Sequence, residues 1–141
     1  MRIHKRLFVR SIALAALALA LTPALVVRQG SASTVQDCGA LIASLRADTA
    51  AVVIVGKNAD KNRVGLLGNL DNASTSLERG KLCDAIRKLT DFQEKVNQLI
   101  ASGSINTDPA VGVTGQDLLN GATDAINCIQ AQATAGGVVC P

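Results

Sequence analysis

Apolar residues recur at helical spacing through most of the chain after residue 36, and this periodicity most constrains the fold. The strongest pattern runs from Lys81 to Ala101, where apolar residues stand three or four positions apart and charged residues fill the gaps. Similar patterns run from Asp37 to Val55, from Asp60 to Arg79 and from Asp117 to Ala133. Four amphipathic helices with mostly short connections predict an all-α, up-and-down four-helix bundle.

Turn and capping residues mark where the predicted helices end. Gly80 can end the second helix, and Ser102-Gly103 can end the third. The segment Thr114–Asp117 has the spacing of a capping box, in which two side chains satisfy the first backbone N–H groups of a helix. Ser104–Val113, which contains an Asp-Pro pair, is therefore predicted to be a loop between the third and fourth helices.

The end of the first helix is ambiguous. The second half of this segment, Ala50–Val55, is rich in β-branched residues, which favour a short buried strand. A strand needs a partner, and no other segment of the chain resembles one. The sequence therefore favours a helix that continues to Val55 and ends at Gly56.

The first 32 residues have the features of a secretory signal peptide. Four basic residues precede an apolar run, Ser11–Leu21, and small residues follow it. Even Ile12–Val27 is shorter than the roughly 20 residues that cross a bilayer as a helix. Cleavage after Ala32 is therefore favoured over an uncleaved N-terminal anchor. We expect a signal peptide over residues 1–32 and a single helical domain over residues 33–141.

The predicted cleavage changes the charge of the chain. Five of the 14 Lys and Arg residues precede the cut and none of the 11 Asp and Glu residues do, so the remaining 109 residues carry a net charge of −2. The single histidine, His4, is also removed, and Phe92 becomes the only aromatic residue. Nucleic-acid binding is disfavoured without a basic surface and stacking aromatics. Without a histidine, the mature chain can have neither a histidine-activated nucleophile nor a metal site with a histidine ligand.

Four cysteines follow the predicted signal peptide: Cys38, Cys83, Cys128 and Cys140. An even number in an exported chain of this size predicts two disulfides, and the wide gaps lack the close pairs of a Cys₄ zinc site. In an up-and-down bundle, all four lie at the same end. Because the third and fourth helices are neighbours, the sequence favours Cys83 with Cys128 and Cys38 with Cys140, although the other two pairings stay open.

Three segments carry a family resemblance. Gly65–Ala73 reads GLLGNLDNA, Leu77–Lys81 reads LERGK and Asp84–Val96 reads DAIRKLTDFQEKV. They resemble the FIMAH-type helical domain of secreted bacterial proteins, whose members share S/G-L-L-x-K-L-D-x-A, L-x-x-G and A-I-x-x-L-x-x-F-x-x-x-V. With Ile100–Gly103 and Leu118–Ala122, the resemblance covers about residues 62–130.

The resemblance implies an extracellular α-helical module without an assigned catalytic activity. Such modules are generally appended to larger exported enzymes or surface proteins. Here the domain would be nearly the whole mature chain, and the four cysteines are not a general feature of the family.

The sequence contains candidate chemical sites, each with a structural interpretation that fits better. Asn58–Asn62 resembles the start of a calcium loop, but Arg63 stands where such a loop needs glycine, so helix capping is favoured. Ser74–Ser76 is a hydroxyl cluster without a general base, which indicates a polar helix face. Phe92 occupies an apolar stripe position, which indicates a core anchor.

Five carboxylates could supply an acid and base pair for hydrolysis. Those of the third helix stand among lysines and arginines, so solvated i,i+4 ion pairs are the favoured interpretation. Examples are Asp84 with Lys88 and Asp91 with Lys95 or Arg87. The five candidates are Asp84, Asp91, Glu94, Asp117 and Asp124.

These observations predict an exported, non-catalytic interaction or structural module, secreted or held in the periplasm or cell envelope. We expect no cofactor, metal, nucleic acid or stable membrane insertion after signal cleavage, and an exported protein or cell-envelope component as partner. One alternative is an inhibitor of an exported enzyme, which would use an exposed apolar patch or a rigid loop, Ser104–Val113. The other is a carrier of a small apolar ligand, in a cavity lined by Leu45, Val52, Leu66, Ile86 and Val96.

Overall fold

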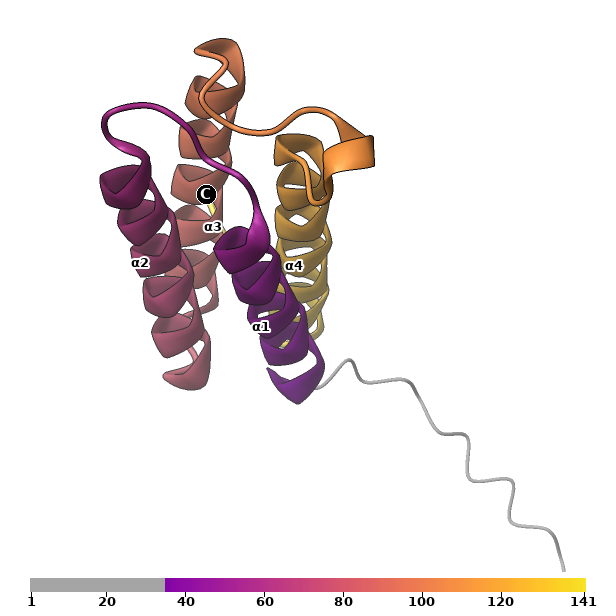
Figure 1. The fold of residues 1–141 in the computed structure, drawn as a ribbon. Helices are drawn as coiled ribbons and strands as arrows, with labels where there is room; N and C mark the ends of the chain where they lie inside the picture. The colour runs from indigo at the N-terminus through magenta and orange to yellow at the C-terminus, as the bar shows by residue number, and fades with distance from the viewer. Residues whose placement is uncertain (1–34) are drawn as a thin grey trace, which may run out of the picture. The chain divides into compact units, whose positions relative to one another are not determined.

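The computed structural model describes residues 35–141, so the predicted signal peptide lies outside the described residues. Its helices are α1 (Val35–Ala51), α2 (Ala59–Glu78), α3 (Leu82–Ala101) and α4 (Gly115–Ala135), with a short 3₁₀ helix, η1 (Pro109–Val111), before α4. Successive helices run in opposite directions, and α4 closes the ring by packing against both α3 and α1 (Figure 1). The prediction of an all-α, up-and-down four-helix bundle stapled by disulfides is confirmed.

The apolar stripe of each helix faces the centre of the bundle. One contiguous core joins the stripes of all four helices, because each amphipathic helix can bury its apolar face only against its neighbours. Phe92 is fully buried in this core, as its position in the stripe predicted. Within residues 35–141, no helix combines the length and the apolar character needed to cross a membrane. The stripe of α3 consists of Ala85, Leu89, Phe92, Val96 and Leu99.

The first helix is shorter than the sequence predicted. α1 ends at Ala51, and Ile54 forms an isolated antiparallel bridge with Ile105 from the connection between α3 and α4. The helical prediction for the last residues before Gly56 was wrong because their strand partner lies in a segment that reads as a loop. Backbone hydrogen bonds on either side of the bridge, each 2.9 Å long, join Val55 N to Ser104 O and Asn106 N to Val53 O.

Arg63 of α2 caps the shortened end of α1. Its guanidinium group donates hydrogen bonds to the carbonyl oxygens of Thr49 at 3.0 Å, Ala50 at 2.7 Å and Val52 at 2.9 Å. Carbonyl groups in the last turn of a helix lack donors within the helix, and the planar guanidinium can serve several of them at once. This role was not predicted from the sequence.

The four cysteines form two disulfides. Cys38 of α1 bonds to Cys128 of α4, and Cys83 of α3 bonds to Cys140 in the C-terminal tail, residues 136–141. Both bonds lie in the half of the bundle where α1 and α3 begin and α4 ends, which agrees with the expectation of a common end. The favoured pairing of Cys83 with Cys128 was wrong.

The face of α4 that carries Cys128 explains the observed pairing. Gly121 lies two helical turns before Cys128 on the same face, and a Cβ atom placed on Gly121 would be 3.2 Å from Leu45 Cδ1 of α1. Leu45 lies two helical turns after Cys38, so the antiparallel packing of α1 and α4 brings the two cysteines together. The side of α4 that meets α3 carries Thr123 instead, which accepts a hydrogen bond from α3.

Candidate functional site

Asp84 and Asp91 both line a shallow surface pocket beside α3. Each carboxylate is about half exposed and pairs with a cation of the same helix, Asp84 with Arg87 at 2.8 Å and Asp91 with Lys88 at 3.4 Å. Both are i,i+3 pairs, whereas the sequence suggested i,i+4 pairs. The partner of Asp91 is Lys88, and the predicted pair with Lys95 does not form. Both carboxylates therefore belong to a solvated, ion-paired face of α3.

Asp117 closes the capping box at the start of α4, which confirms that prediction. Its Oδ2 accepts hydrogen bonds from the Thr114 backbone N–H at 2.8 Å and from the Thr114 hydroxyl at 2.7 Å, while Thr114 Oγ1 accepts one from the Asp117 N–H at 3.1 Å. The hydroxyl and the backbone N–H of Thr114 hold the pKa of the Asp117 carboxyl below its usual range, because they stabilise its charged form. Glu94 and Asp124 are exposed on α3 and α4.

Acidification is expected to weaken this cap. The pKa of Asp117 is lower in the folded protein than in the unfolded chain, so its contribution is complete above the unfolded pKa, about 4, and is lost as the pH falls through the folded pKa. Thermal unfolding at about pH 7 and about pH 3, followed by circular dichroism, should therefore depend less on pH in Asp117→Asn than in the unsubstituted protein.

Asp124→Asn is the matched control for this measurement, because it makes the same charge change at an exposed position of the same helix. Part of the pH dependence should persist in both variants, since the hydrogen bond from Arg46 lowers the pKa of Asp71. Equal pH dependence in the two variants would contradict the role assigned to Asp117.

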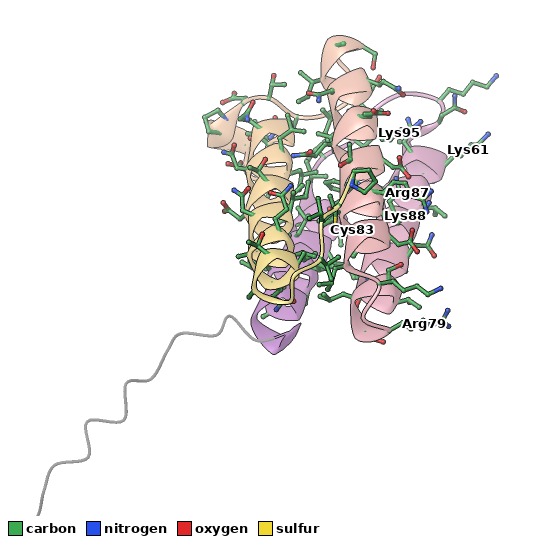
Figure 2. All side chains as sticks on the ribbon, turned by 180° about the vertical axis from the view of Figure 1, so that it is seen from behind. Lys61, Arg79, Cys83, Arg87, Lys88 and Lys95 are labelled. Atoms are coloured by element: carbon green, nitrogen blue, oxygen red, sulfur yellow. A yellow bond between two sulfur atoms is a disulfide. The ribbon has the colours of Figure 1, made fainter. Side chains whose placement is uncertain are left out.

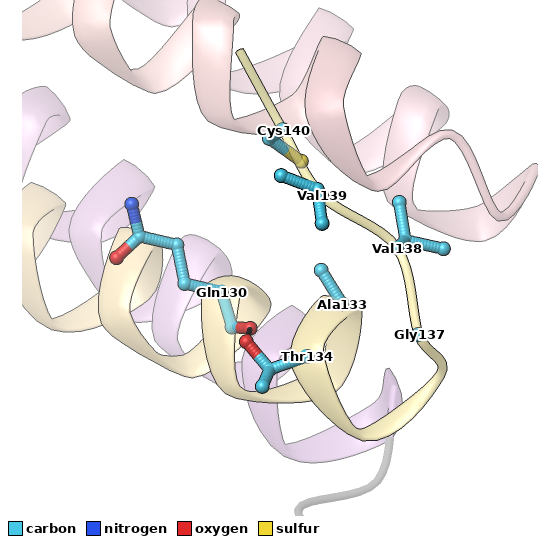
Figure 3. Close-up of a pocket in the computed structure, with 7 residues that line it drawn as sticks. All are labelled: Gln130, Ala133, Thr134, Gly137, Val138, Val139 and Cys140. Carbon is cyan, nitrogen blue, oxygen red and sulfur yellow. Dashed lines mark hydrogen bonds between the residues drawn. The ribbon is translucent and has the colours of Figure 1, made fainter.

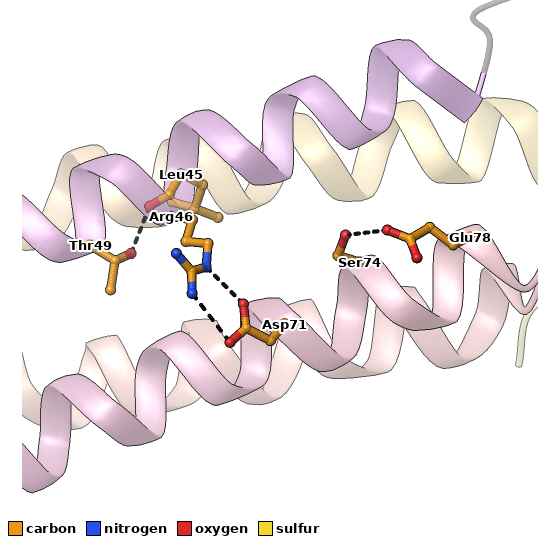
Figure 4. A network of polar contacts seen from close by, with 6 residues as sticks. All are labelled: Leu45, Arg46, Thr49, Asp71, Ser74 and Glu78. Atoms are coloured by element: carbon orange, nitrogen blue, oxygen red, sulfur yellow. Dashed lines mark hydrogen bonds and ion pairs between the residues drawn. The ribbon is translucent and has the colours of Figure 1, made fainter.

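Polar side chains of α1 and α2 make contacts within and between these two helices (Figure 4). Arg46 donates to both carboxylate oxygens of Asp71, at 2.7 and 3.4 Å, and so links the two helices. The buried Thr49 hydroxyl donates to the carbonyl oxygen of its own helix at Leu45, 2.7 Å away. Of the hydroxyl cluster, Ser74 donates to a Glu78 oxygen at 3.3 Å.

The segment proposed as the start of a calcium loop begins α2. Asn58 is its N-cap residue, although its side chain makes no capping hydrogen bond. Arg63, which stands at the glycine position of such a loop, is engaged with α1. Among the described residues, no three His, Cys, Asp or Glu side chains are grouped so that they could hold a metal ion.

The residues proposed to line a ligand cavity are mostly part of the packed core. Leu45, Val52, Leu66 and Val96 are at most 1% exposed and belong to the contiguous core cluster. Ile86 is half-buried and lines the surface pocket beside α3. The structure therefore does not bring these five residues together around the pocket beside α3.

Ser104–Val113, which we call the α3–α4 loop, is the best candidate interaction site. Its first turn is fixed by Asn106, whose Nδ2 donates to the carbonyl oxygens of Asp108 at 3.0 Å and Val113 at 2.9 Å. Asn106 Oδ1 accepts from the Asp108 N–H at 3.0 Å. The Asn106 backbone pairs with Val53 on one side and accepts from the Gly115 N–H at 2.8 Å on the other. One asparagine thus joins both ends of the loop.

The far side of the α3–α4 loop is fixed by Asp108 and by a glycine. Asp108 Oδ1 accepts from the Ala110 N–H at 2.9 Å and so caps η1, whose first residue is Pro109. Gly112 follows with φ of 127° and ψ of −147°, a conformation that side chains disfavour. The loop therefore has one defined shape that its own residues specify.

The tip of this loop faces solvent. Residues 107–112 are exposed, and Val111 is 61% exposed at the apex, whereas Ile105 is only 4% exposed and anchors the loop in the core. The connection between α1 and α2 lies at the same end of the bundle (Figure 1). It exposes two further apolar side chains, Val53 and Val55.

Asn106→Ala is expected to loosen the α3–α4 loop and to lower the free energy of unfolding by about 1–3 kcal/mol, because three hydrogen bonds lose their side-chain partner. Hydrogen exchange of residues 107–113 and denaturation followed by circular dichroism measure the two effects. Thr107→Ala, an exposed change in the same loop, is the control. Equal effects of the two substitutions would contradict this role.

A second surface feature lies at the opposite end, where the C-terminal tail passes over α4. Gln130, Ala133 and Thr134 of α4 form one wall of a pocket (Figure 3). The tail forms the other wall, from Gly137 to Cys140. The sequence had given no sign of this pocket, because its walls depend on where the second disulfide anchors the tail.

The sequence identified the α3–α4 loop as long enough to bind a partner but did not identify the residues that shape it. The available signal was the order Asn106, Asp108-Pro109 and Gly112, a set of residues that favour turns and caps. No protein-family model, curated protein or solved structure matches the chain.

Proposed function

We propose that this chain is an exported, non-catalytic interaction module that binds another exported protein through the α3–α4 loop. The proposal rests on one observation, the fixed shape of a loop whose exposed tip presents the apolar side chain of Val111. A preorganised loop loses little conformational entropy on binding, so its contacts contribute more fully to affinity. Loops held by a rigid scaffold are common places for binding residues.

Two features support export. Disulfides persist in oxidising compartments and are rare in the cytosol, and the structure has two of them. The basic and apolar segment at the N-terminus has the order of a secretory signal. The resemblance to FIMAH-type domains, which stays a prediction, points to the same compartment.

The distribution of charge indicates what kind of partner fits. All Lys and Arg residues after the predicted cleavage site precede residue 96, and five of them are labelled in Figure 2. The α3–α4 loop and α4 carry only acidic charged residues: Asp108, Asp117 and Asp124. Complementary charge favours a partner with an apolar cleft and a basic rim.

Inhibition of an exported enzyme is a second candidate function, favoured by the same loop. A rigid, protruding loop with an apolar apex can occupy the substrate cleft of an enzyme without rearranging. This candidate differs from simple binding in one measurable way, since one equivalent of the protein would abolish the activity of its partner.

The proposal can be tested by capture followed by a binding measurement. Immobilised, oxidised protein is exposed to the culture medium of its source, and each captured protein is purified and titrated calorimetrically. We expect Val111→Asp to weaken binding by about tenfold or more, because it places a charge at the apex of the loop. Val64→Asp is the matched control, since Val64 is a similarly exposed valine, 69% against 61%, on α2.

Equal weakening by Val111→Asp and Val64→Asp would refute the loop as the binding site. Loss of affinity at high salt should accompany binding if the rim of the partner is basic. If the purified protein binds no exported protein or envelope polysaccharide but hydrolyses a substrate, the non-catalytic assignment is wrong.

A further inference from the structure

The two disulfides lie in different environments. Cys38 is fully buried in the core cluster, and Cys128, which is partly exposed, packs against that cluster. Cys83 and Cys140 are partly exposed and lie outside that cluster. Cys140 lines both surface pockets, and Cys83 lines the one beside α3. A reagent in solution can therefore approach both cysteines of the second disulfide from a surface pocket, whereas the first disulfide has one fully buried cysteine and one that packs against the core.

The exposed disulfide holds the C-terminal tail in place. The Val138 N–H donates to the Ala133 carbonyl oxygen at 2.8 Å, and among the described residues it is the last backbone group of the tail with such a bond. Val139 is 91% exposed. The attachment of the last residues to α3 therefore depends on the bond between Cys83 and Cys140.

The tail lies between two surface pockets, one bordered by α4 and the other by α3. The pocket on the α4 side has Ala133 in its wall, and the pocket on the α3 side has Ile86 and Thr90. Cys140 borders both pockets, so the tail forms a wall that they share. Release of the tail would join the two pockets into one groove between α3 and α4.

We propose that the Cys83–Cys140 disulfide is a thiol-exchange site whose reduction releases the C-terminal tail and opens the groove between α3 and α4. The reductant is a dithiol, either a small molecule or a protein with a pair of cysteines. One of its thiolates attacks Sγ of Cys140 and forms a mixed disulfide, and the Cys83 sulfur leaves as a thiolate that takes a proton from water. The second thiolate of the reductant then displaces Cys140, and the reductant becomes a disulfide.

The position of Cys83 favours this direction of attack. Cys83 is the second residue of α3, and the positive end of the helix dipole stabilises a thiolate there. A more stable thiolate leaves faster. Attack at Cys140 is therefore favoured, and the mixed disulfide forms on the released tail.

Graded reduction of the native protein tests the proposal. The oxidised protein is treated with dithiothreitol, quenched with iodoacetamide at intervals and digested with trypsin. Cys38 and Cys83 then lie on different peptides, because Arg46 and Lys81 separate them, and each reports on one disulfide. We expect Cys83 to be alkylated at least about tenfold faster than Cys38.

Hydrogen exchange and circular dichroism on the same samples show what reduction does. The Val138 amide should lose protection when Cys83 is alkylated, while the helical signal is retained. Cys83→Ala combined with Cys140→Ala should give the same exchange pattern, and its remaining disulfide should resist the same treatment. Equal alkylation rates, no reduction under native conditions or unchanged protection of Val138 would each overturn the proposal. Alkylation, hydrogen exchange and circular dichroism can all be measured on the unsubstituted protein.

Discussion

Replacing both Cys38 and Cys128 with alanine is expected to lower the free energy of unfolding by about 4 kcal/mol. Their disulfide joins the first helix to the last across a sequence separation of 90 residues, so its removal gives the unfolded chain much additional freedom. Denaturation by guanidinium, followed by far-UV circular dichroism, measures the loss. The chain has no tryptophan or tyrosine whose fluorescence could serve instead.

The same double substitution at Cys83 and Cys140 is the matched control. This disulfide spans 57 residues, but its removal also frees the C-terminal tail in the folded state, which offsets part of the entropy gained by the unfolded chain. We expect a smaller loss of about 2 kcal/mol. Equal losses in the two variants, or a larger one here, would show that the tail contributes more to the bundle than its contacts indicate.

Helices were the part of the structure that the sequence predicted well. α2, α3 and α4 each begin and end within two residues of the predicted limits, because a regular apolar stripe and a glycine or capping box define them. The same pattern predicted the burial of Phe92, because its position in the apolar stripe was enough to assign it to the core. Such signals are local and need no knowledge of neighbouring helices.

The disulfide pairing failed because it depends on the rotation of each helix about its axis. The sequence placed Cys128 near the correct end of the bundle, but α4 touches both α1 and α3, and the stripe alone did not show which neighbour Cys128 faces. The small residue Gly121, on the same face, was the overlooked signal. It allows α1 to approach closely through Leu45.

Tertiary pairing also decided the end of α1 and the shape of the candidate site. The β-branched residues of Ala50–Val55 favour extended structure, but the partner of Ile54 lies far along the chain in the α3–α4 loop, in a segment without a strand pattern. Likewise, the role of Asn106 depends on contacts with residues at both ends of that loop. In both places the residues favour the local conformation that the structure has. The tertiary contacts that fix this conformation cannot be read from the sequence.

Phe92→Ala is expected to lower the free energy of unfolding by about 3–5 kcal/mol, because it removes a fully buried ring and leaves a cavity that the surrounding helices fill only in part. Phe92 is the only aromatic residue among those described, and stabilities of small domains are about 5–15 kcal/mol, so the bundle would lose a large share of its margin. Denaturation followed by far-UV circular dichroism measures the loss. Phe92→Leu, which keeps an apolar side chain in place, should cost less, and Val64→Ala at an exposed position should cost little. A loss of similar size in all three variants would mean that the core does not depend on this ring, and would contradict the packing by which α3 holds the bundle together.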